Sequence, residues 1–449
     1  MSLPAGGTRP RSLGFHHPVA VWTGCVLIVA GVLAHAPMFW MGRNMGFRLV
    51  GMPMDATMLI GMAMIPLGLA LAAWGLLPRL HGMHRTGELR DARAFHAADG
   101  AALNRAHWTL VVVLVMALAV DVLKPASLGF VMPGLTREYG ISKEIGGLLP
   151  LVALTGTVVG SVLWGRLADV AGRRAAILLS ALMFIGTAIC GAMPAFGWNL
   201  AMCFLMGASA GGLLPITFTL MAEMIPAAHR GWLLVALGGI GTSAGYLLAA
   251  GAAALLEPQF SWRALWLLGL PTGLLIVVLD RFIPESPRFL QSAGLHAEAR
   301  EVLVRYAAVP DRPDDPAHAP EDDEMRTTAS AWALLGGSHA AITHGLLLAG
   351  IAWGLANFGF LLWLPTNLRA LGMDGGTVSS LLARSAVLAL PGIAVVIWLY
   401  HRWSSIRALV LFLALTAVSL GAFFALGSSG LRSQTLVVAA TVALLVSSS

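Results

Sequence analysis

Long apolar stretches recur along the chain, and short polar segments separate them. Each stretch is close to, or longer than, the roughly 20 residues that a helix needs to cross the hydrocarbon core of a bilayer. None shows the alternation of polar and apolar residues that is typical of a membrane-spanning strand. We therefore expect transmembrane helices near residues 19–41, 56–77, 108–133, 145–166, 174–193, 198–221, 231–256, 263–283, 339–369, 378–400, 406–427 and 433–449.

The polar segments divide this series of helices into an N-terminal pair and two lobes. Residues 281–335 include an amphipathic stretch, Leu295 to Ala307, which predicts a short helix, and then an acidic, proline-rich piece at 310–324 that is typical of a linker. We expect two extra helices in 1–78, a cytoplasmic linker in 79–107, a six-helix lobe in 108–283, a second cytoplasmic linker in 284–335 and about four further helices in 336–449.

The composition supports an all-α, polytopic membrane protein. Hydrophobic residues make up 57% of the 449 positions and charged residues only 11%, whereas a soluble domain carries about 25% charged residues. The net charge of +6 does not indicate a nucleic-acid partner, because the arginines are spread over short loops beside apolar runs. The three cysteines lie in apolar runs and show no spacing of a disulfide framework or zinc site.

A basic ten-residue turn at 165–174 joins the fourth and fifth predicted helices. Its glycines, Gly165 and Gly172, remove side chains at both ends, so we expect two helix ends to approach closely there. The turn also places Asp169 among three arginines, Arg166, Arg173 and Arg174. Arginines beside apolar segments indicate the cytoplasmic side of a membrane.

This turn and two later motifs resemble the major facilitator superfamily, a large group of secondary transporters. Gly207 to Gly212, followed by Glu223 and Arg230, resembles the fourth core span and following loop of the sugar-porter and organic-acid proton symporter branches. Residues 284–290, Pro-Glu-Ser-Pro-Arg-Phe-Leu, resemble the heptad that follows the sixth span in those branches. Within the heptad, Ser286 and Pro287 also suit the start of a helix.

The resemblance implies two pseudo-symmetric helical lobes and an inner gate whose ion pairs break when the carrier opens inward. The gate residues that it implies are Gly165, Asp169, Gly172, Arg173, Arg174, Glu223, Arg230, Glu285 and Arg288. Two positions depart from the family pattern: Val170 stands where Arg or Lys is usual, and Cys203 stands where the fourth span often has an arginine tied to proton coupling.

The number of spans also departs from the family. Counting from the first motif gives ten core spans before Ser449, where the family has twelve. We therefore expect the second lobe to lack its last two spans, as in a truncated product, a fragment or a chain that another chain completes. Alternatively, the two extra N-terminal helices make up the number twelve by coincidence.

Ionisable residues inside predicted spans are the candidates for transport. Asp121 and Lys124 are three residues apart, so they share a helical face, and Arg384 lies in the eighth core span. Asp121 could accept the coupling proton, while Lys124 and Arg384 attract an anionic group; alternatively, Asp121 and Lys124 neutralise each other as a structural pair. In the seventh core span, Asn357 is a further candidate for the lining of a substrate cavity.

A methionine-rich stretch near the N-terminus offers an alternative function. His35, Met38, Met41 and Met58 lie at spacings that two adjoining helices could bring together. Thioethers and an imidazole suit Cu(I), although methionine also packs irregular helix contacts in an apolar bundle. Copper or another metal is therefore an alternative cargo.

The sequence thus predicts a proton-coupled, alternating-access carrier for a small organic solute, in particular an organic anion such as a carboxylate. It lacks a phosphate-binding loop, a nucleophile elbow and a metalloprotease helix, so we expect neither an enzyme nor a cofactor. The expected partners are a small-molecule substrate, a proton and the lipid bilayer, in a bacterial plasma membrane. Besides the metal carrier, a non-transporting membrane sensor or assembly protein is the remaining alternative.

Overall fold

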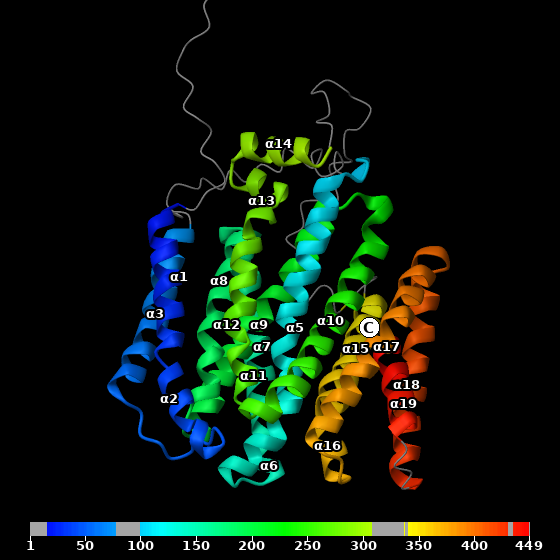
Figure 1. Cartoon of the computed structure of the whole chain (residues 1–449). Coiled ribbons are helices and arrows are strands. Elements are labelled where there is room, and N and C mark those ends of the chain that lie inside the picture. The colour runs from blue at the N-terminus through cyan, green and yellow to red at the C-terminus, as the bar shows by residue number, and fades with distance from the viewer. Residues whose placement is uncertain (1–15, 78–98, 308–335, 337–339, 430–433, 449) are drawn as a thin grey trace, which may run out of the picture.

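The computed structural model describes residues 16–77, 99–307, 336, 340–429 and 434–448 (Figure 1). The described part of the chain is built of helices and contains no strand, which confirms the all-α prediction. It holds eleven helical segments long and apolar enough to cross a membrane and one shorter apolar helix, Gln434–Ser447. The predicted acidic linker at 310–324 lies outside the described residues.

The two extra N-terminal helices form a closely packed pair at one edge of the molecule (Figure 1). They are α1 (Pro18–Leu33), which continues into α2 (Ala36–Met41), and α3 (Ala56–Leu76). A Cβ atom on Gly61 would lie 2.7 Å from the carbonyl oxygen of Gly31, so small residues permit the close contact. The pair packs against α8 of the first lobe.

The first lobe is a six-span bundle with the main apolar core. Its helices are α5 (Arg105–Tyr139), α6 (Lys143–Gly146), α7 (Leu148–Ala171), α8 (Arg173–Gly186), α9 (Phe196–Met224), α10 (Ala227–Phe260), α11 (Ala264–Leu267) and α12 (Gly269–Leu279), with a 3₁₀ turn, η3 (Thr187–Ala192), after α8. The glycine-rich motif of α9 faces α7: a side chain on Gly207 or Gly211 would clash with the α7 backbone. The motif thereby fixes the closest helix pair of the lobe.

Two short helices close one end of the first lobe (Figure 1). α13 (Pro287–Ser292) begins as predicted, because Ser286 Oγ accepts a hydrogen bond from Phe289 N and Pro287 occupies the first helical position. α14 (His296–Arg305) corresponds to the predicted amphipathic helix and lies crosswise over the end of the bundle. This end carries the arginine-rich loops and is the predicted cytoplasmic side.

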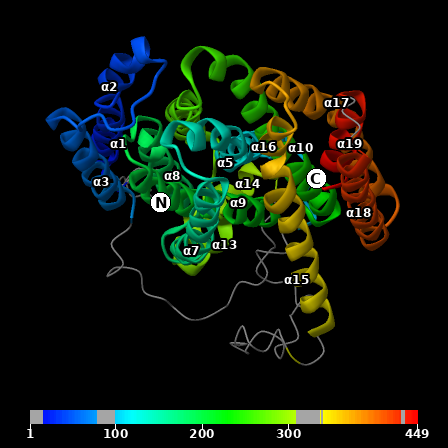
Figure 2. The same cartoon turned by 90° about the horizontal axis from the view of Figure 1, so that it is seen from below.

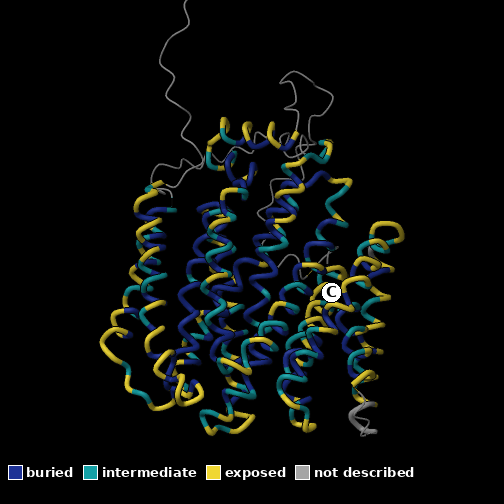
Figure 3. Tube along the Cα trace, viewed as in Figure 1, coloured by how far each residue is buried: buried dark blue, intermediate teal, exposed yellow. Residues whose placement is uncertain are grey.

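The second lobe contributes α15 (Ala340–Gly354), a π-helical segment η8 (Leu355–Phe360), the short η9 (Leu361–Trp363), α16 (Leu364–Ala370), α17 (Gly375–Arg402), α18 (Ser405–Ser429) and α19 (Gln434–Ser447). α17 packs along α10, and α16 packs against α5, so both helices join the lobes. The view from below shows α15 reaching outward from this contact (Figure 2). Burial is densest in the first lobe, whereas α15 and α18 are largely exposed (Figure 3).

Candidate functional site

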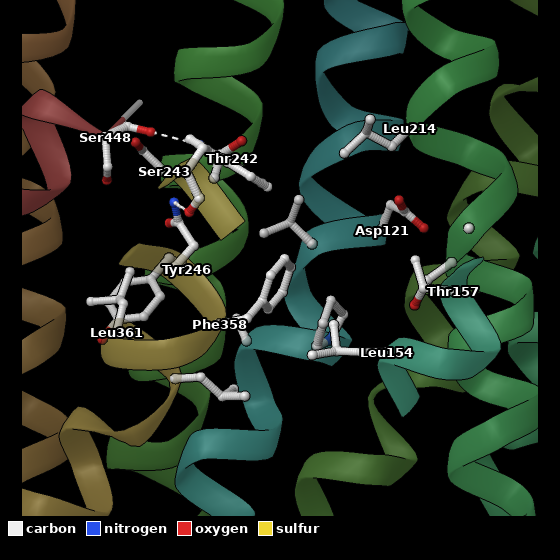
Figure 4. A pocket seen from close by; sticks show the side chains of 18 of the residues that line it. Asp121, Leu154, Thr157, Leu214, Thr242, Ser243, Tyr246, Phe358, Leu361 and Ser448 are labelled. Carbon is white, nitrogen blue, oxygen red and sulfur yellow. Dashed lines mark hydrogen bonds between the residues drawn. The ribbon is translucent and has the colours of Figure 1, made fainter. Parts of the chain in front are cut away.

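A cavity of about 220 Å³ lies between the two lobes. α5, α7, α9 and α10 form its first-lobe wall, and α15, η8, η9 and α19 form the opposite wall. In Figure 4, Asp121 lies beside Thr157 and Leu214, while Tyr246 and Leu361 lie across the cavity with Phe358 between. Its polar lining comes from Asp121, Thr157, Ser161, Thr242, Ser243, Tyr246, Trp353, Asn357 and Ser448.

Asp121 is the one charged residue that lines this cavity among the described residues. Its side chain is 3% exposed, and Oδ1 is buried without a hydrogen-bond partner in the described part of the chain. Pro125, four residues later in α5, has no N–H for the Asp121 carbonyl, so the helix is locally weakened at this point. A buried carboxyl with an unused oxygen is suited to exchange a proton or to bind a solute.

Lys124 does not face the cavity, although it lies one turn from Asp121. Its Nζ donates to the carbonyl of Phe184 at 2.7 Å and to Thr187 Oγ1 at 2.5 Å, and it lies 3.9 Å from the Phe184 ring centroid. The four-carbon stem carries the ammonium away from Asp121, and the described residues show no ion pair between the two. Arg384 is exposed on α17 and does not line the cavity either. The predicted grouping of these three charges around one anion is therefore wrong.

We expect Lys124→Met to leave solute affinity unchanged, because the ammonium does not reach the cavity. Thr187 already donates to Phe184 O at 2.8 Å, so the partners of Lys124 stay hydrogen-bonded to each other. The apolar isostere should keep thermal stability within about 1 kcal/mol, or raise it. Uptake kinetics and thermal unfolding of the purified variant measure both; a tenfold rise in KM would return Lys124 to the binding site.

Asn357 lies in the π-helical segment η8 and lines the cavity. Its Nδ2 donates to the carbonyl of Trp353 at 3.0 Å. On the α10 wall of the cavity, the Tyr246 hydroxyl is buried and has no hydrogen-bond partner among the described residues. Thr157 and Ser161 were not predicted as lining residues, although two hydroxyls four residues apart in an apolar run share a helical face.

The cluster predicted as an inner gate is centred on Glu285. Its carboxylate accepts hydrogen bonds from the backbone N–H groups of Arg173 (2.7 Å), Arg174 (3.3 Å) and Ser286 (3.0 Å). These are N–H groups of the first turn of α8 and of the α13 cap, so one side chain caps α8 from a distant part of the chain. Gly172 has φ of +103° beside this carboxylate, and a Cβ there would clash with Glu285.

The arginine side chains of this cluster bind acids of the same lobe. Arg173 Nη2 lies 3.1 Å from Glu223 and 3.2 Å from Asp169, and Arg173 Nη1 donates to the Ala168 carbonyl at 3.0 Å. Arg174 binds Asp280 with two hydrogen bonds, at 2.9 and 2.5 Å. The pairs of Arg173 with Asp169 and Glu223 and of Arg174 with Asp280 therefore brace the first lobe.

Three further residues of the predicted gate, Arg230, Arg288 and Gly165, lie outside the Glu285 cluster. Arg230 binds Asp99, a partner that was not predicted, and Arg288 is exposed at the start of α13. The close approach predicted at Gly165 is wrong, because a Cβ there would meet nothing within 4 Å. Gly165 lies within α7, and only Gly172 marks the end of that helix.

Burial raises the pKa of Glu285 from its ordinary value of 4.5 to about 7, against the three N–H groups and the Arg173 charge, which lower it. The folded state therefore holds this proton more tightly than the unfolded state. The resulting stabilisation is full below about pH 4.5 and is lost as the pH rises through about 7, by up to about 3 kcal/mol. We expect Glu285→Gln, a permanently neutral variant, to gain stability relative to the unsubstituted protein between pH 5 and pH 8. Thermal unfolding of both proteins across this pH range tests this expectation. Parallel plots of unfolding temperature against pH for the two proteins would contradict it.

The lobes are tied together at the end away from α13 and α14. Arg369 of α16 and Glu257 of α10 form a bidentate pair at 2.9 and 2.6 Å. Beside it, within the first lobe, the fully buried Arg263 binds Glu138, which also accepts from Leu49 N at 2.9 Å. Both pairs were missed, since their partners are more than 100 residues apart along the chain.

The methionine-rich stretch brings Met38 and Met58 into one buried apolar cluster, but it does not gather all four residues of the metal alternative. His35, Met38 and Met58 are buried, and His35 Nδ1 lies 2.9 Å from the Gly31 carbonyl oxygen. Met41 is 56% exposed, so it lies on another face of the chain. The described residues contain no group of three or more His, Cys, Asp or Glu side chains placed to hold a metal ion.

Comparisons with known proteins agree with this architecture. The family model described as Major Facilitator Superfamily matches residues 109–448. The niacin transporter NiaP of Acinetobacter baylyi is 27% identical over 321 residues, which cover 71% of this chain and 72% of that protein. The 4-hydroxybenzoate transporter PcaK of Pseudomonas aeruginosa is 29% identical over 341 residues, 74% of either chain. PcaK of Acinetobacter baylyi is 31% identical, and the match spans 62% of its length.

Solved structures show the same fold at low sequence identity. The partially occluded, inward-open xylose transporter XylE from E. coli superposes with a TM-score of 0.58 at 16% identity, over 77% of this chain and 82% of that one. A double-tryptophan variant of XylE gives 0.60 at 17% identity, over 76% and 78%. The chain therefore belongs to the major facilitator superfamily of membrane transporters, which are carriers and not enzymes.

Proposed function

We propose that this protein carries a small aromatic carboxylate across a bacterial plasma membrane together with a proton, by alternating access. The observation that carries the proposal is the buried carboxyl of Asp121, with an unused oxygen, in a cavity between two lobes. Relatives named for niacin and 4-hydroxybenzoate, both aromatic monocarboxylates, support the solute class.

The cavity suits a solute of about one ring. At about 220 Å³ it is smaller than the roughly 300–1,000 Å³ of sites that hold drug-sized ligands. Phe358, Tyr246 and Trp353 supply aromatic surface, while Asn357 and Ser243 supply polar groups that can orient a carboxylate.

Coupling follows from the charge of Asp121. An anionic solute and an ionised Asp121 repel each other across a small, buried cavity, whereas a protonated Asp121 can donate a hydrogen bond to the solute. Solute and proton therefore favour each other's binding, and each does so by the same factor. The loaded carrier, with a protonated Asp121 and one monoanion, then has the same net charge as the empty carrier whose Asp121 is ionised.

Flux measurements in proteoliposomes test this function. With one proton per monoanion, an inward pH gradient of one unit should drive about tenfold accumulation of 4-hydroxybenzoate. Benzamide, which has a similar shape without the charge, should not accumulate, and protein-free liposomes correct for passive entry of the neutral acid. Uptake of 4-hydroxybenzoate, nicotinate and benzoate at the protein-free rate would reject the proposed solute class. Accumulation independent of the pH gradient would reject the coupling.

A further inference from the structure

A second cavity, of about 300 Å³, lies between the lobes beside α16, away from α13 and α14. Its first-lobe wall comes from the end of α5 and the start of α6, and its second-lobe wall from Trp363 and α16. It shares no lining residue with the central cavity. The two cavities are nevertheless neighbours, because Leu361 and Leu362 line the central cavity and the next residue, Trp363, lines the second one. Between the two cavities, Gly129 of α5 touches the backbone of Leu362 so closely that a Cβ would clash.

The charge of this second cavity is positive. Arg137, Lys143 and Arg369 line it, and no acid does. Glu257 neutralises Arg369, but neither Arg137 nor Lys143 forms an ion pair within 4 Å with a described residue. Glu144, the sequence neighbour of Lys143, does not line the cavity.

Two buried polar groups of the same cavity lack partners. Thr366 is 8% exposed, and its Oγ1 has no hydrogen-bond partner among the described residues. The Nε–H of Arg369 is buried and likewise has no acceptor there. A buried donor without an acceptor is destabilising, and an anionic oxygen placed between these groups would accept hydrogen bonds from both. Trp363, Ile141 and Met132 add an apolar wall against which a ring can pack.

We propose that this second cavity is an outer vestibule that binds an organic carboxylate, with Arg137, Lys143 and Thr366 as its ligands. The inference rests on the proposed function and deepens it, because it gives the solute a first binding place before the Gly129–Leu362 constriction. Since the ligands come from both lobes, an occupied vestibule spans the contact that must open for the solute to pass.

A cysteine at the rim can report vestibule occupancy without transport. Ala370 is exposed and lines the cavity, whereas the native cysteines Cys25, Cys190 and Cys203 are buried. We expect a membrane-impermeant maleimide to label Ala370→Cys, but not the unsubstituted chain, and benzoate to slow labelling in a saturable way. Benzamide should give no protection. Arg137→Gln with Lys143→Gln should raise the half-protecting benzoate concentration at least tenfold, and the near-isosteric Thr366→Val about threefold.

Two further measurements distinguish benzoate binding in the vestibule from binding in the central cavity and from occupation of the vestibule by a lipid head group. Asn357→Ala, which alters only the central cavity, should leave protection unchanged while it weakens benzoate flux. Protection should be equal in nanodiscs with and without phosphatidylglycerol, since a lipid head group would compete with benzoate. Equal protection by benzamide, protection that survives the double substitution, or loss of protection in Asn357→Ala would each overturn the vestibule. Absence of 4-hydroxybenzoate, nicotinate and benzoate flux, with saturable protection by benzoate intact, would refute the proposed function and leave the vestibule standing.

Discussion

Replacing Asp121 by asparagine is expected to abolish uphill solute uptake while the protein still folds and still exchanges solute. Asparagine keeps the shape and a hydrogen-bond donor but cannot take up or release a proton. The bound anion then no longer requires a proton, so a pH gradient of one unit should drive no accumulation instead of about tenfold. Counterflow with equal solute on both sides, which needs no coupling, should continue.

Lys124→Met is the matched control, since it also removes a buried charge from α5, one turn away. It should retain pH-driven accumulation, because its ammonium lies against Phe184 and Thr187 rather than in the cavity. Unchanged accumulation in Asp121→Asn at every pH would show that another group carries the proton. Loss of counterflow as well, in a protein with normal thermal unfolding, would instead place Asp121 in solute binding alone.

Much of the fold could be predicted because apolar length and loop motifs are local properties of the sequence. The runs located each membrane helix, and the turn at 165–174 follows the fourth span, as counted from the sequence. Ser286 and Pro287 start α13 through contacts within four residues. Helix ends were less accurate: α5 and α10 extend several residues beyond the predicted apolar runs, because their polar ends stay helical outside a hydrocarbon core.

The candidate site was harder to predict, because helical spacing gives the position of each Cα atom but not the position of the functional group at the end of a long side chain. Helical spacing placed Lys124 on the face of Asp121, yet its long stem turns to α8. The π-helical turn around Asn357 changes the face that each following residue presents, and no periodicity in the sequence marks it. Asp280 and Asp99 bind arginines more than 100 residues away, so only the folded chain identifies these partners.

Replacing Gly172 by alanine should destabilise the folded protein by about 2–4 kcal/mol and reduce the yield of transport-competent carrier at least tenfold. The backbone there, with φ +103° and ψ 154°, lies in a region that is almost confined to glycine, which alone costs about 1–3 kcal/mol for another residue. The new Cβ would also displace the Glu285 carboxylate, which caps α8, and would lie 3.0 Å from Phe289. Thermal unfolding and the monodisperse fraction after purification measure the effect.

Gly165→Ala is the control that shows whether the destabilisation is specific to Gly172 or follows from any glycine-to-alanine substitution in the motif. Its Cβ would meet nothing, and alanine in a helix interior is favoured over glycine by about 0.5–1 kcal/mol, so stability should hold or rise. The double variant Gly172→Ala with Glu285→Ala then divides the loss at Gly172 into clash and backbone strain. If the clash dominates, the double variant should lose no more stability than Glu285→Ala alone; if strain dominates, the two losses should add. A stable Gly172→Ala protein with full transport would mean that the Glu285 cap is dispensable, and the motif would then need another explanation.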